Sequence, residues 1–180
     1  MTTSKIFNII LIGGVGAGKT SYLNLLKTKK FKFHKYEPTL GYDLTYLDIV
    51  TNDGSYKLNI WDISGDFNYQ NGIENFCKTV AIDGVIIFKT QSYLSQYINN
   101  LIELLQQKKR NIILIDIWYK TDHPDENKNY NNHSQFYLDK DRATYRLNSI
   151  YSKQENLWQP IRDFLNTTTQ DRVKEIISID

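Results

Sequence analysis

Residues 5–20 read KIFNIILIGGVGAGKT, and this stretch decides the fold. Residues 5–13 form a short, nearly continuous apolar run, which is typical of a central strand buried on both faces. Residues 13–20 match the pattern G-x-x-x-x-G-K-[ST], and residues 19–30 have the periodicity of a helix. A strand, a glycine-rich loop and a helix in this order predict a loop that binds the phosphates of a nucleotide. The alternative is a glycine-rich turn without a ligand, which the flanking strand and helix disfavour.

The residue types of this loop suit phosphate chemistry. Glycines let the backbone approach phosphates closely, and successive N–H groups at the start of a helix face the negative charge. Lys19 is expected to reach the β- and γ-phosphates, and the Thr20 hydroxyl is expected to bind Mg²⁺. The residues expected to contact the nucleotide in this segment are Gly13, Val15, Gly16, Ala17, Gly18, Lys19, Thr20 and Ser21.

Composition limits the classes of protein that the chain can represent. A length of 180 residues predicts one domain, with a core at about residues 5–168 and a short tail at 169–180. A net charge of +2 gives no strong basic field that favours nucleic acid or membrane, and we expect a monomer. The single cysteine, Cys77, excludes a disulfide within the chain, which fits a reducing compartment. The last residues, KEIISID, offer no cysteine for prenylation, so we expect no membrane anchor.

A hairpin is predicted directly after the first helix. Residues 42–51 and 55–62 are two strand-like arms around Asn52-Asp53-Gly54, and Asp-Gly between such arms is a strong turn signal. Beyond the hairpin we expect buried strands at 83–90 and 111–118, a helix within 92–109, a polar surface loop at 120–141, a last strand within 143–150 and a last helix within 155–168. Pro160 is compatible with that helix only in its first turn. The pattern predicts an α/β three-layer domain, with a mostly parallel six-stranded sheet that includes one antiparallel hairpin.

Two further segments carry residues that can bind a metal. Asp62 ends the second arm of the hairpin, and an aspartate at a strand end often holds Mg²⁺ in phosphoryl-transfer proteins. Residues 35–41, KYEPTLG, form a loop whose threonine is placed to complete the metal shell. Alone, Asp62 could cap a turn and Thr39 could be an ordinary loop hydroxyl.

With these motifs in order, the chain resembles a small GTPase of the Ras superfamily, and within it most resembles Ran, a nuclear-transport member. The resemblance rests on the phosphate loop, on KYEPTLGYDL (35–44) and on TNDGSYKLNIWDISG (51–65), and it covers about residues 5–168. It implies GTP or GDP as the ligand, Mg²⁺ as the cofactor, partners that read the switch segments, nuclear transport receptors among them, and a location in the cytoplasm or nucleus.

The resemblance also assigns roles to individual residues. Thr20, Thr39 and Asp62 are expected at Mg²⁺, and the Gly65 N–H at the γ-phosphate. Tyr36 is expected over the phosphates, and Phe31 or Phe33 at the edge of the base. In residues 119–122, YKTD, Lys120 is expected to cover the guanine ring and Asp122 to accept hydrogen bonds from it; an Asx-turn at Asp122 is the alternative.

Four departures from the family bear on activity. Asp66 stands where the family has the glutamine that orients the attacking water, and Val15 replaces a glycine beside the γ-phosphate. Tyr119 replaces the asparagine of the base loop, and Tyr151 replaces a small alanine. With Asp66 and Gly65 at the catalytic position, we expect a guanine-nucleotide switch with slow or absent hydrolysis. A pseudo-GTPase that binds partners without turnover and a P-loop kinase or ATPase are the alternatives.

Overall fold

The computed structural model describes nine segments of the chain: residues 5–28, 37–51, 54–89, 96–108, 113–118, 135–139, 142–146, 154–169 and 176–179. The strands are β1 (Lys5–Gly13), β2 (Tyr42–Thr51), β3 (Gly54–Ile63), β4 (Gly84–Lys89), β5 (Ile113–Trp118), β6 (Gln135–Asp139), β7 (Arg142–Arg146) and β8 (Ile176–Ile179). The helices are α1 (Lys19–Thr28), the 3₁₀ turn η1 (Phe67–Tyr69), α2 (Gln70–Thr79), α3 (Gln96–Lys108), α4 (Gln154–Leu157) and α5 (Gln159–Thr169).

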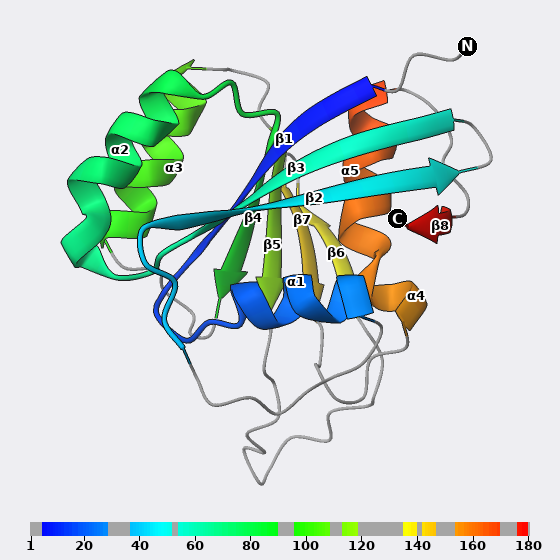
Figure 1. Ribbon diagram of the computed structural model, residues 1–180, viewed down its shortest axis with the longest axis horizontal. Helices are drawn as coiled ribbons and strands as arrows, with labels where there is room; N and C mark the ends of the chain where they lie inside the picture. The colour runs from blue at the N-terminus through cyan, green and yellow to red at the C-terminus, as the bar shows by residue number, and fades with distance from the viewer. Residues whose placement is uncertain are drawn as a thin grey trace, which may run out of the picture.

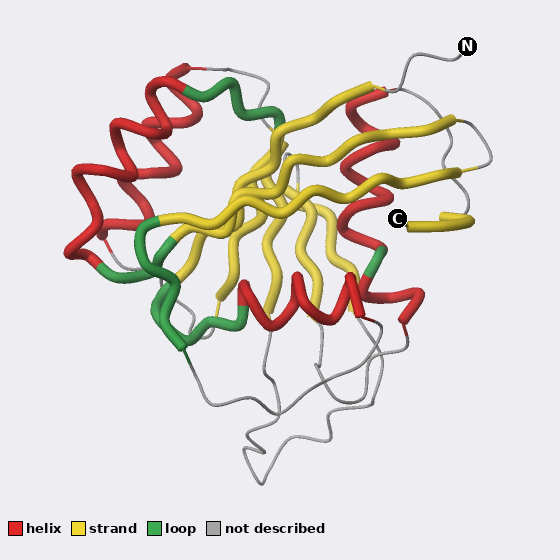
Figure 2. The backbone as a smooth tube through the Cα atoms, in the orientation of Figure 1, coloured by secondary structure: helices red, strands yellow, loops and turns green. Residues whose placement is uncertain are grey.

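The eight strands of the described segments join one sheet, in the order β6-β7-β5-β4-β1-β3-β2-β8. Its centre is parallel, because β1 pairs with both β3 and β4, β4 pairs with β5, and β5 pairs with β7. The pairs β2–β3, β6–β7 and β2–β8 are antiparallel. Figure 2 shows the strands fanning apart as the sheet twists. The prediction of an α/β domain is therefore confirmed.

The expected strand number and the single hairpin were wrong. Residues 120–141 were expected to be a loop, yet β6 forms there and makes a second hairpin with β7, in which Asp139 pairs with Arg142. The short apolar stretch in QFYLD was hidden by the polar residues before it. Within residues 169–180, the short tail of the sequence analysis, β8 pairs with β2 and satisfies backbone groups at the sheet edge.

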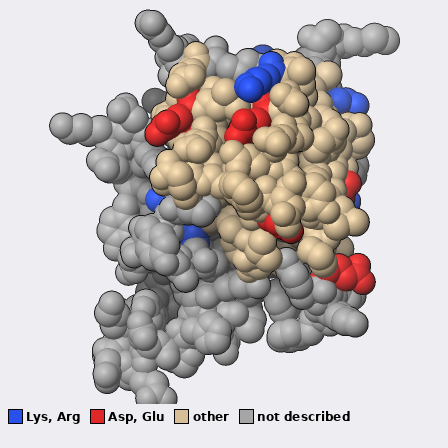
Figure 3. Space-filling view, turned by 90° about the vertical axis from the view of Figure 1, so that its left-hand side faces the viewer, with Lys and Arg blue, Asp and Glu red and all other residues tan. Residues whose placement is uncertain are grey.

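Helices cover both faces of the sheet. One core cluster joins α1, α4 and α5 to the first face, with Tyr22, Leu26, Ile161 and Phe164 among its members. The second cluster packs α2 and α3 against the other face, with Phe76 among its members. Figure 1 shows α2 with α3 at one side of the sheet and α1 with α5 at the other. Figure 3 views the α2–α3 side, where acidic and basic side chains lie scattered rather than gathered by sign.

Two features of the helices agree with the sequence. The buried side of α1 consists of Lys19, Tyr22, Leu23, Leu25 and Leu26, in agreement with the helical periodicity of residues 19–30. The last predicted helix is broken into α4 and α5, and Pro160 is the second residue of α5. Proline has no N–H to donate, and this position in the first turn needs none. The sequence pattern had not predicted α2, which follows η1 directly.

The order of the strands determines at which edge of the sheet a ligand site can form. The chain crosses from one side of β1 to the other between β3 and β4, so β1 lies at a switch point in strand order. Because β1, β3 and β4 are parallel, the loops after β1 and β3 leave the same edge of the sheet. Ligands of open α/β sheets bind at this kind of edge.

Candidate nucleotide site

The loop between β1 and α1 is shaped by glycine. Gly16 and Gly18 have φ of 70° and 95°, in the left-handed region that residues with a Cβ rarely adopt. The Ala17 N–H donates to the Gly14 carbonyl at 3.2 Å, which closes the turn. The result is a tight loop that ends at the first turn of a helix, as the sequence predicted.

Lys19 places a buried positive charge under this loop. Its ammonium donates hydrogen bonds to the carbonyl oxygens of Gly13 and Gly14, at 3.0 and 3.1 Å. Burial lowers the pKa of Lys19, and the negative charge of Asp62 acts in the opposite direction. A buried cation that rests on neutral carbonyls suits an incoming anion such as a phosphate.

Three oxygen-bearing side chains from three segments meet beside the loop. The Thr20 hydroxyl from α1 donates to Oδ2 of Asp62 at the end of β3. The Thr39 hydroxyl lies 3.4 Å from the same Oδ2 and 3.2 Å from the Thr20 Oγ1. The residues that the sequence proposed as metal ligands thus converge, although 42 positions separate Thr20 from Asp62 along the chain.

Asp62 is the buried carboxylate of this cluster. Its side chain is 2% exposed, and burial raises the pKa of Asp62. The hydrogen bond from Thr20, the charge of Lys19 and the hydrogen bond from Thr39 act to lower that pKa. The second carboxylate oxygen, Oδ1, is buried and has no hydrogen-bond partner within the described part of the chain. A buried oxygen of this kind is costly unless a cation or donor reaches it.

These residues fit Mg²⁺. The ion prefers oxygen ligands, and in phosphate sites it is held by one or two carboxylates, hydroxyls, water and the phosphates themselves. Across the described segments, no group of three or more His, Cys, Asp or Glu side chains could hold a metal ion. The cluster of Thr20, Thr39 and Asp62 would supply part of the coordination shell, and phosphate oxygens and water would supply the rest. When bound, the ion neutralises charge on the phosphates.

The loop after β3 packs on the phosphate loop through Gly65. A Cβ built on Gly65 would lie 2.4 Å from the Gly14 carbonyl carbon, 2.5 Å from the Val15 nitrogen and 2.6 Å from the Gly13 oxygen. All three are backbone atoms, so only glycine lets the two loops come this close. The predicted γ-phosphate position of Gly65 is thus beside the loop that would hold that phosphate.

Asp66 and Val15, the two unusual residues, both lie at this point. Asp66 is the N-cap of η1, and its Oδ1 accepts the Asn68 N–H at 2.9 Å. Its side chain therefore stabilises the backbone of its own turn. Val15 is 61% exposed, and its backbone nitrogen is part of the phosphate loop on which Gly65 packs.

Other predicted site residues lie outside the described residues. They are Tyr36, Phe31, Phe33, Tyr119, Lys120, Asp122 and Tyr151. The structure brings together the phosphate-loop residues, Thr39, Asp62, Gly65 and Asp66, and their assigned roles stay predictions.

The sequence interpretation missed Ser64. Its side chain is 4% exposed, its hydroxyl oxygen accepts the Asp66 N–H at 3.2 Å, and its own N–H donates to the Gly41 carbonyl at 2.7 Å. The only available signal was a hydroxyl residue between Asp62 and Gly65.

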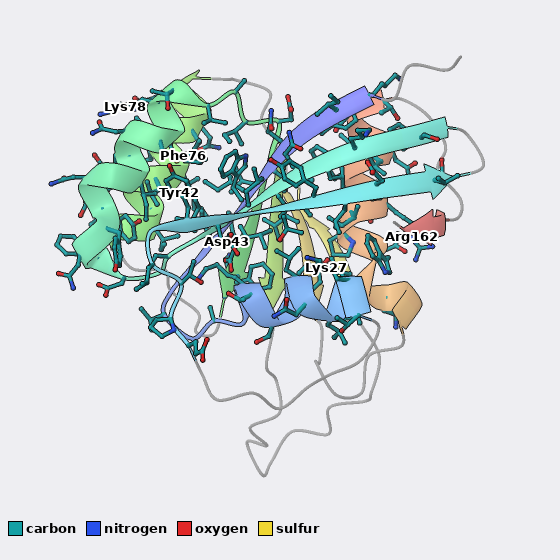
Figure 4. The ribbon with its side chains drawn as sticks, in the orientation of Figure 1. Lys27, Tyr42, Asp43, Phe76, Lys78 and Arg162 are labelled. Atoms are coloured by element: carbon teal, nitrogen blue, oxygen red, sulfur yellow. The ribbon has the colours of Figure 1, made fainter. Side chains whose placement is uncertain are left out.

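An aromatic cluster was also missed. Ring centroids of Tyr42 and Trp61 lie 5.7 Å apart, those of Tyr42 and Phe76 4.6 Å apart, and those of Trp61 and Phe76 4.8 Å apart. Figure 4 shows Tyr42 beside Phe76, where β2 meets α2. The cluster joins the hairpin to the helix that follows the Asp66 turn.

Taken together, strand order, phosphate loop and threonine–aspartate cluster define a P-loop nucleotide-binding domain. The family model of the Roc domain, described as "Ras of Complex, Roc, domain of DAPkinase", matches residues 8–122, which is more than half of the chain. The chain belongs to the Roc family of small GTPase domains in the Ras superfamily. Members of this superfamily bind GTP or GDP together with Mg²⁺.

Curated relatives agree on the superfamily but not on the predicted branch. The chain is 35% identical over 79 residues to the mouse Ras-related protein Rab-7b, and 36% identical over 67 residues to the Ras-related protein Rab7A of Mesembryanthemum crystallinum. The first match covers 44% of this chain and 38% of the relative, and the second covers 37% and 32%. The chain thus spans less than half the length of these relatives. They are Rab7 proteins, so closeness to Ran is not confirmed. No helix among the described residues combines the length and apolarity needed to cross a membrane.

Proposed function

We propose that this protein is a guanine-nucleotide switch that holds Mg²⁺ and GTP and hydrolyses GTP very slowly. The observation that carries the proposal is the meeting of Thr20, Thr39 and Asp62 beside the buried Lys19. Thr39 comes from the segment before β2 and Asp62 from the end of β3, so both segments reach the place where a γ-phosphate and its metal would lie.

Ground-state binding is proposed to use three sets of groups: the phosphate loop, the threonine–aspartate cluster and the base loop. The backbone of the phosphate loop and the Lys19 ammonium supply positive potential for the phosphates. Thr20, Thr39 and Asp62 supply oxygen ligands for Mg²⁺. Lys120 and Asp122 are the residues that we propose for guanine recognition, with weaker discrimination because Tyr119 and Tyr151 replace two family residues.

Hydrolysis needs an oriented water and stabilisation of charge that spreads over the γ-phosphate oxygens. Asp66 is acceptor-only when ionised, and its carboxylate already accepts the Asn68 N–H. Its negative charge opposes the charge of the transition state. Val15 adds a branched, exposed side chain to the phosphate loop where the family has glycine, and we propose that it takes up space that the attacking water and a partner's arginine need. Both effects act on the transition state more than on binding.

A pseudo-GTPase that binds partners through the same segments is the second candidate. The cap formed by Asp66 favours it, because the side chain at the catalytic position stabilises a turn. Ran-like specificity, nuclear transport receptors as partners, the monomeric state and a cytoplasmic or nuclear location stay predictions. The match to the Roc family model argues against a P-loop kinase or ATPase.

Single-turnover phosphate release from Mg²⁺–GTP tests the lead proposal. Wild type should be slow, and the double variant Val15→Gly with Asp66→Gln should be faster than either single variant if both residues block one step. Asp48→Gln is the matched control: Asp48 is half-exposed on β2 and pairs only loosely with Lys57, at 3.6 Å. A wild-type rate equal to that of ordinary small GTPases, or a double variant no faster than wild type, contradicts the proposal. GTP bound without any release, in all variants, favours the pseudo-GTPase.

A further inference from the structure

The hairpin strand β2 leaves part of its outer edge open. In the order of the sheet, β2 lies between β3 and β8, and β8 pairs only with residues 49–51. Within the described part of the chain, residues 42–48 are paired on one side only, by β3. Figure 1 shows β8 beside the last part of β2. An open edge of this kind can add an extended segment from another chain.

The hydrogen bonds of the hairpin show which backbone groups of β2 point outward. The Ser64 N–H donates to the Gly41 carbonyl at 2.7 Å, which extends the β2–β3 ladder by one hydrogen-bonded pair. In an antiparallel ladder such pairs recur at every second residue. The groups that face β3 therefore belong to residues 41, 43, 45, 47 and 49, and the groups that face outward belong to residues 42, 44, 46, 48 and 50. The strand β8 meets one of the outward residues, because Val50 pairs with Ser178.

The open part of this edge is bounded at both ends. Toward α2, the Leu44 N–H donates to Oδ1 of Asp43 at 2.9 Å, so a side chain of β2 itself satisfies that donor. The Tyr42 ring packs on Phe76 of α2, with centroids 4.6 Å apart. Toward the hairpin turn, β8 takes up Val50. Residues 44–48, which we call the open β2 edge, leave five backbone groups for a further strand: the Leu44 carbonyl and the N–H and carbonyl groups of Tyr46 and Asp48.

Side chains beside the open β2 edge indicate what kind of strand fits it. Tyr46 is 67% exposed and lies on the same face of the strand as Leu44, so this face offers apolar surface. The strand β2 carries two carboxylates and neither lysine nor arginine. Asp48 pairs with Lys57 at 3.6 Å, whereas the Asp43 carboxylate lies at the edge itself, where it reaches the Leu44 N–H. A strand with apolar side chains beside Tyr46 and a basic side chain near Asp43 complements this edge in polarity and charge.

We propose that the open β2 edge binds an extended segment of a partner protein in which apolar residues alternate with lysine or arginine. The segment runs antiparallel to β2 and in line with β8. Its apolar residues lie opposite residues 44, 46 and 48 and turn their N–H and carbonyl groups toward β2, because opposite residues of a hydrogen-bonded pair exchange both bonds. Its basic residues turn their backbone groups to water. The inference goes beyond the proposed nucleotide switch and does not rest on it, because the β2–β3 ladder is formed by the chain alone.

An NMR titration of the full chain with the peptide Lys-Val-Lys-Val-Lys-Val, blocked at both ends, tests the proposal. The largest shifts should occur at the amides of Tyr46 and Asp48. Two methylated forms of the peptide distinguish strand pairing from other contacts. N-methylation of the valines removes the N–H groups that face β2, and it should weaken binding by at least about tenfold. N-methylation of the lysines removes N–H groups that face water, and it should change the affinity by less than about threefold.

Variants of the protein test the same contacts from the other side. Tyr46→Pro removes an outward N–H that the β2–β3 ladder does not use, and proline is tolerated on edge strands in this orientation. Its matched control is Tyr46→Ala, which also lacks the ring but keeps the N–H. The proline variant should bind the peptide about two- to tenfold more weakly than the alanine variant. Asp43→Asn should weaken binding by about two- to fivefold. Glu103→Gln removes an exposed carboxylate from α3 and should leave binding unchanged.

Three results would overturn strand pairing at this edge: no binding of the peptide, shifts centred away from β2, or equal affinity of the two methylated peptides. A peptide with glutamate in place of lysine that binds as tightly would overturn the basic character of the partner. If Tyr46→Pro does not fold, the methylated peptides and Asp43→Asn still decide the proposal.

Discussion

Replacing Gly65 by alanine tests whether the loop after β3 must lie against the phosphate loop. The added Cβ would lie 2.4 Å from the Gly14 carbonyl carbon, whereas ordinary contacts begin at 3.4 Å. The two loops would therefore have to separate by about 1.0 Å, the difference between these distances. The obstructing atoms belong to the backbone, so no side-chain rotation relieves the contact. Overpacking of this kind costs about 1–3 kcal/mol.

Gly72 offers the same substitution with the opposite expected sign. It lies inside α2, and a Cβ built there meets nothing within 4 Å. Alanine in a helix is more stable than glycine by about 0.5–1 kcal/mol. The free energies of unfolding of the two variants should therefore differ by about 1.5–4 kcal/mol, with wild type between them.

Urea denaturation at equal nucleotide and Mg²⁺ concentrations measures these free energies, and thermal melting supports them. For a chain of this size, the midpoint should fall by about 2–12 °C in Gly65→Ala and rise by about 1–4 °C in Gly72→Ala. Affinity for a fluorescent GDP analogue should also fall in Gly65→Ala. Equal stability of Gly65→Ala and wild type would refute the close packing of the two loops. Loss of stability in Gly72→Ala would show that the difference between the two positions has another origin.

Three more predictions concern the phosphate site, the preference for guanine and a buried tyrosine. Lys19→Ala should abolish binding of a fluorescent GDP analogue, because it removes the buried ammonium, and unchanged affinity would contradict the phosphate site. Competition of GTP against ATP should show reduced but real preference for guanine; full preference or none would count against the base site proposed above. Tyr97→Phe should stabilise by up to about 1 kcal/mol, because the Tyr97 hydroxyl is buried without a hydrogen-bond partner in the described part of the chain. Burial raises the pKa of Tyr97, so the stability that its neutral form contributes is present below pH 10 and is lost as pH rises further; urea denaturation at pH 8 and about pH 11 should show less alkaline loss in Tyr97→Phe.

Local pattern was enough for much of this protein. The phosphate loop is contiguous in sequence, so the spacing of its glycines and lysine is enough to identify it. The Asp-Gly turn between two alternating arms predicted the β2–β3 hairpin, which runs in register from Tyr42↔Ile63 to Thr51↔Gly54. Asp62 could be singled out because it ends a strand of that hairpin.

Other features depend on partners that lie far away in the sequence. The strand β8 exists because β2 leaves an edge open about 125 residues upstream, and four residues give no such signal by themselves. The helix α2 is stabilised by packing against α3 and the aromatic cluster rather than by strong helix formers.

The sequence by itself determined a P-loop domain of the Ras superfamily and the chemical types at its site. Only the tertiary structure decided how Asp66 is used. From sequence, Asp66 is a poor substitute for a catalytic glutamine; in the fold, it caps η1 and is positioned by the Ser64 hydroxyl. The reason is physical. A motif fixes which groups a chain offers, whereas burial and the available donors decide which hydrogen bond each group makes.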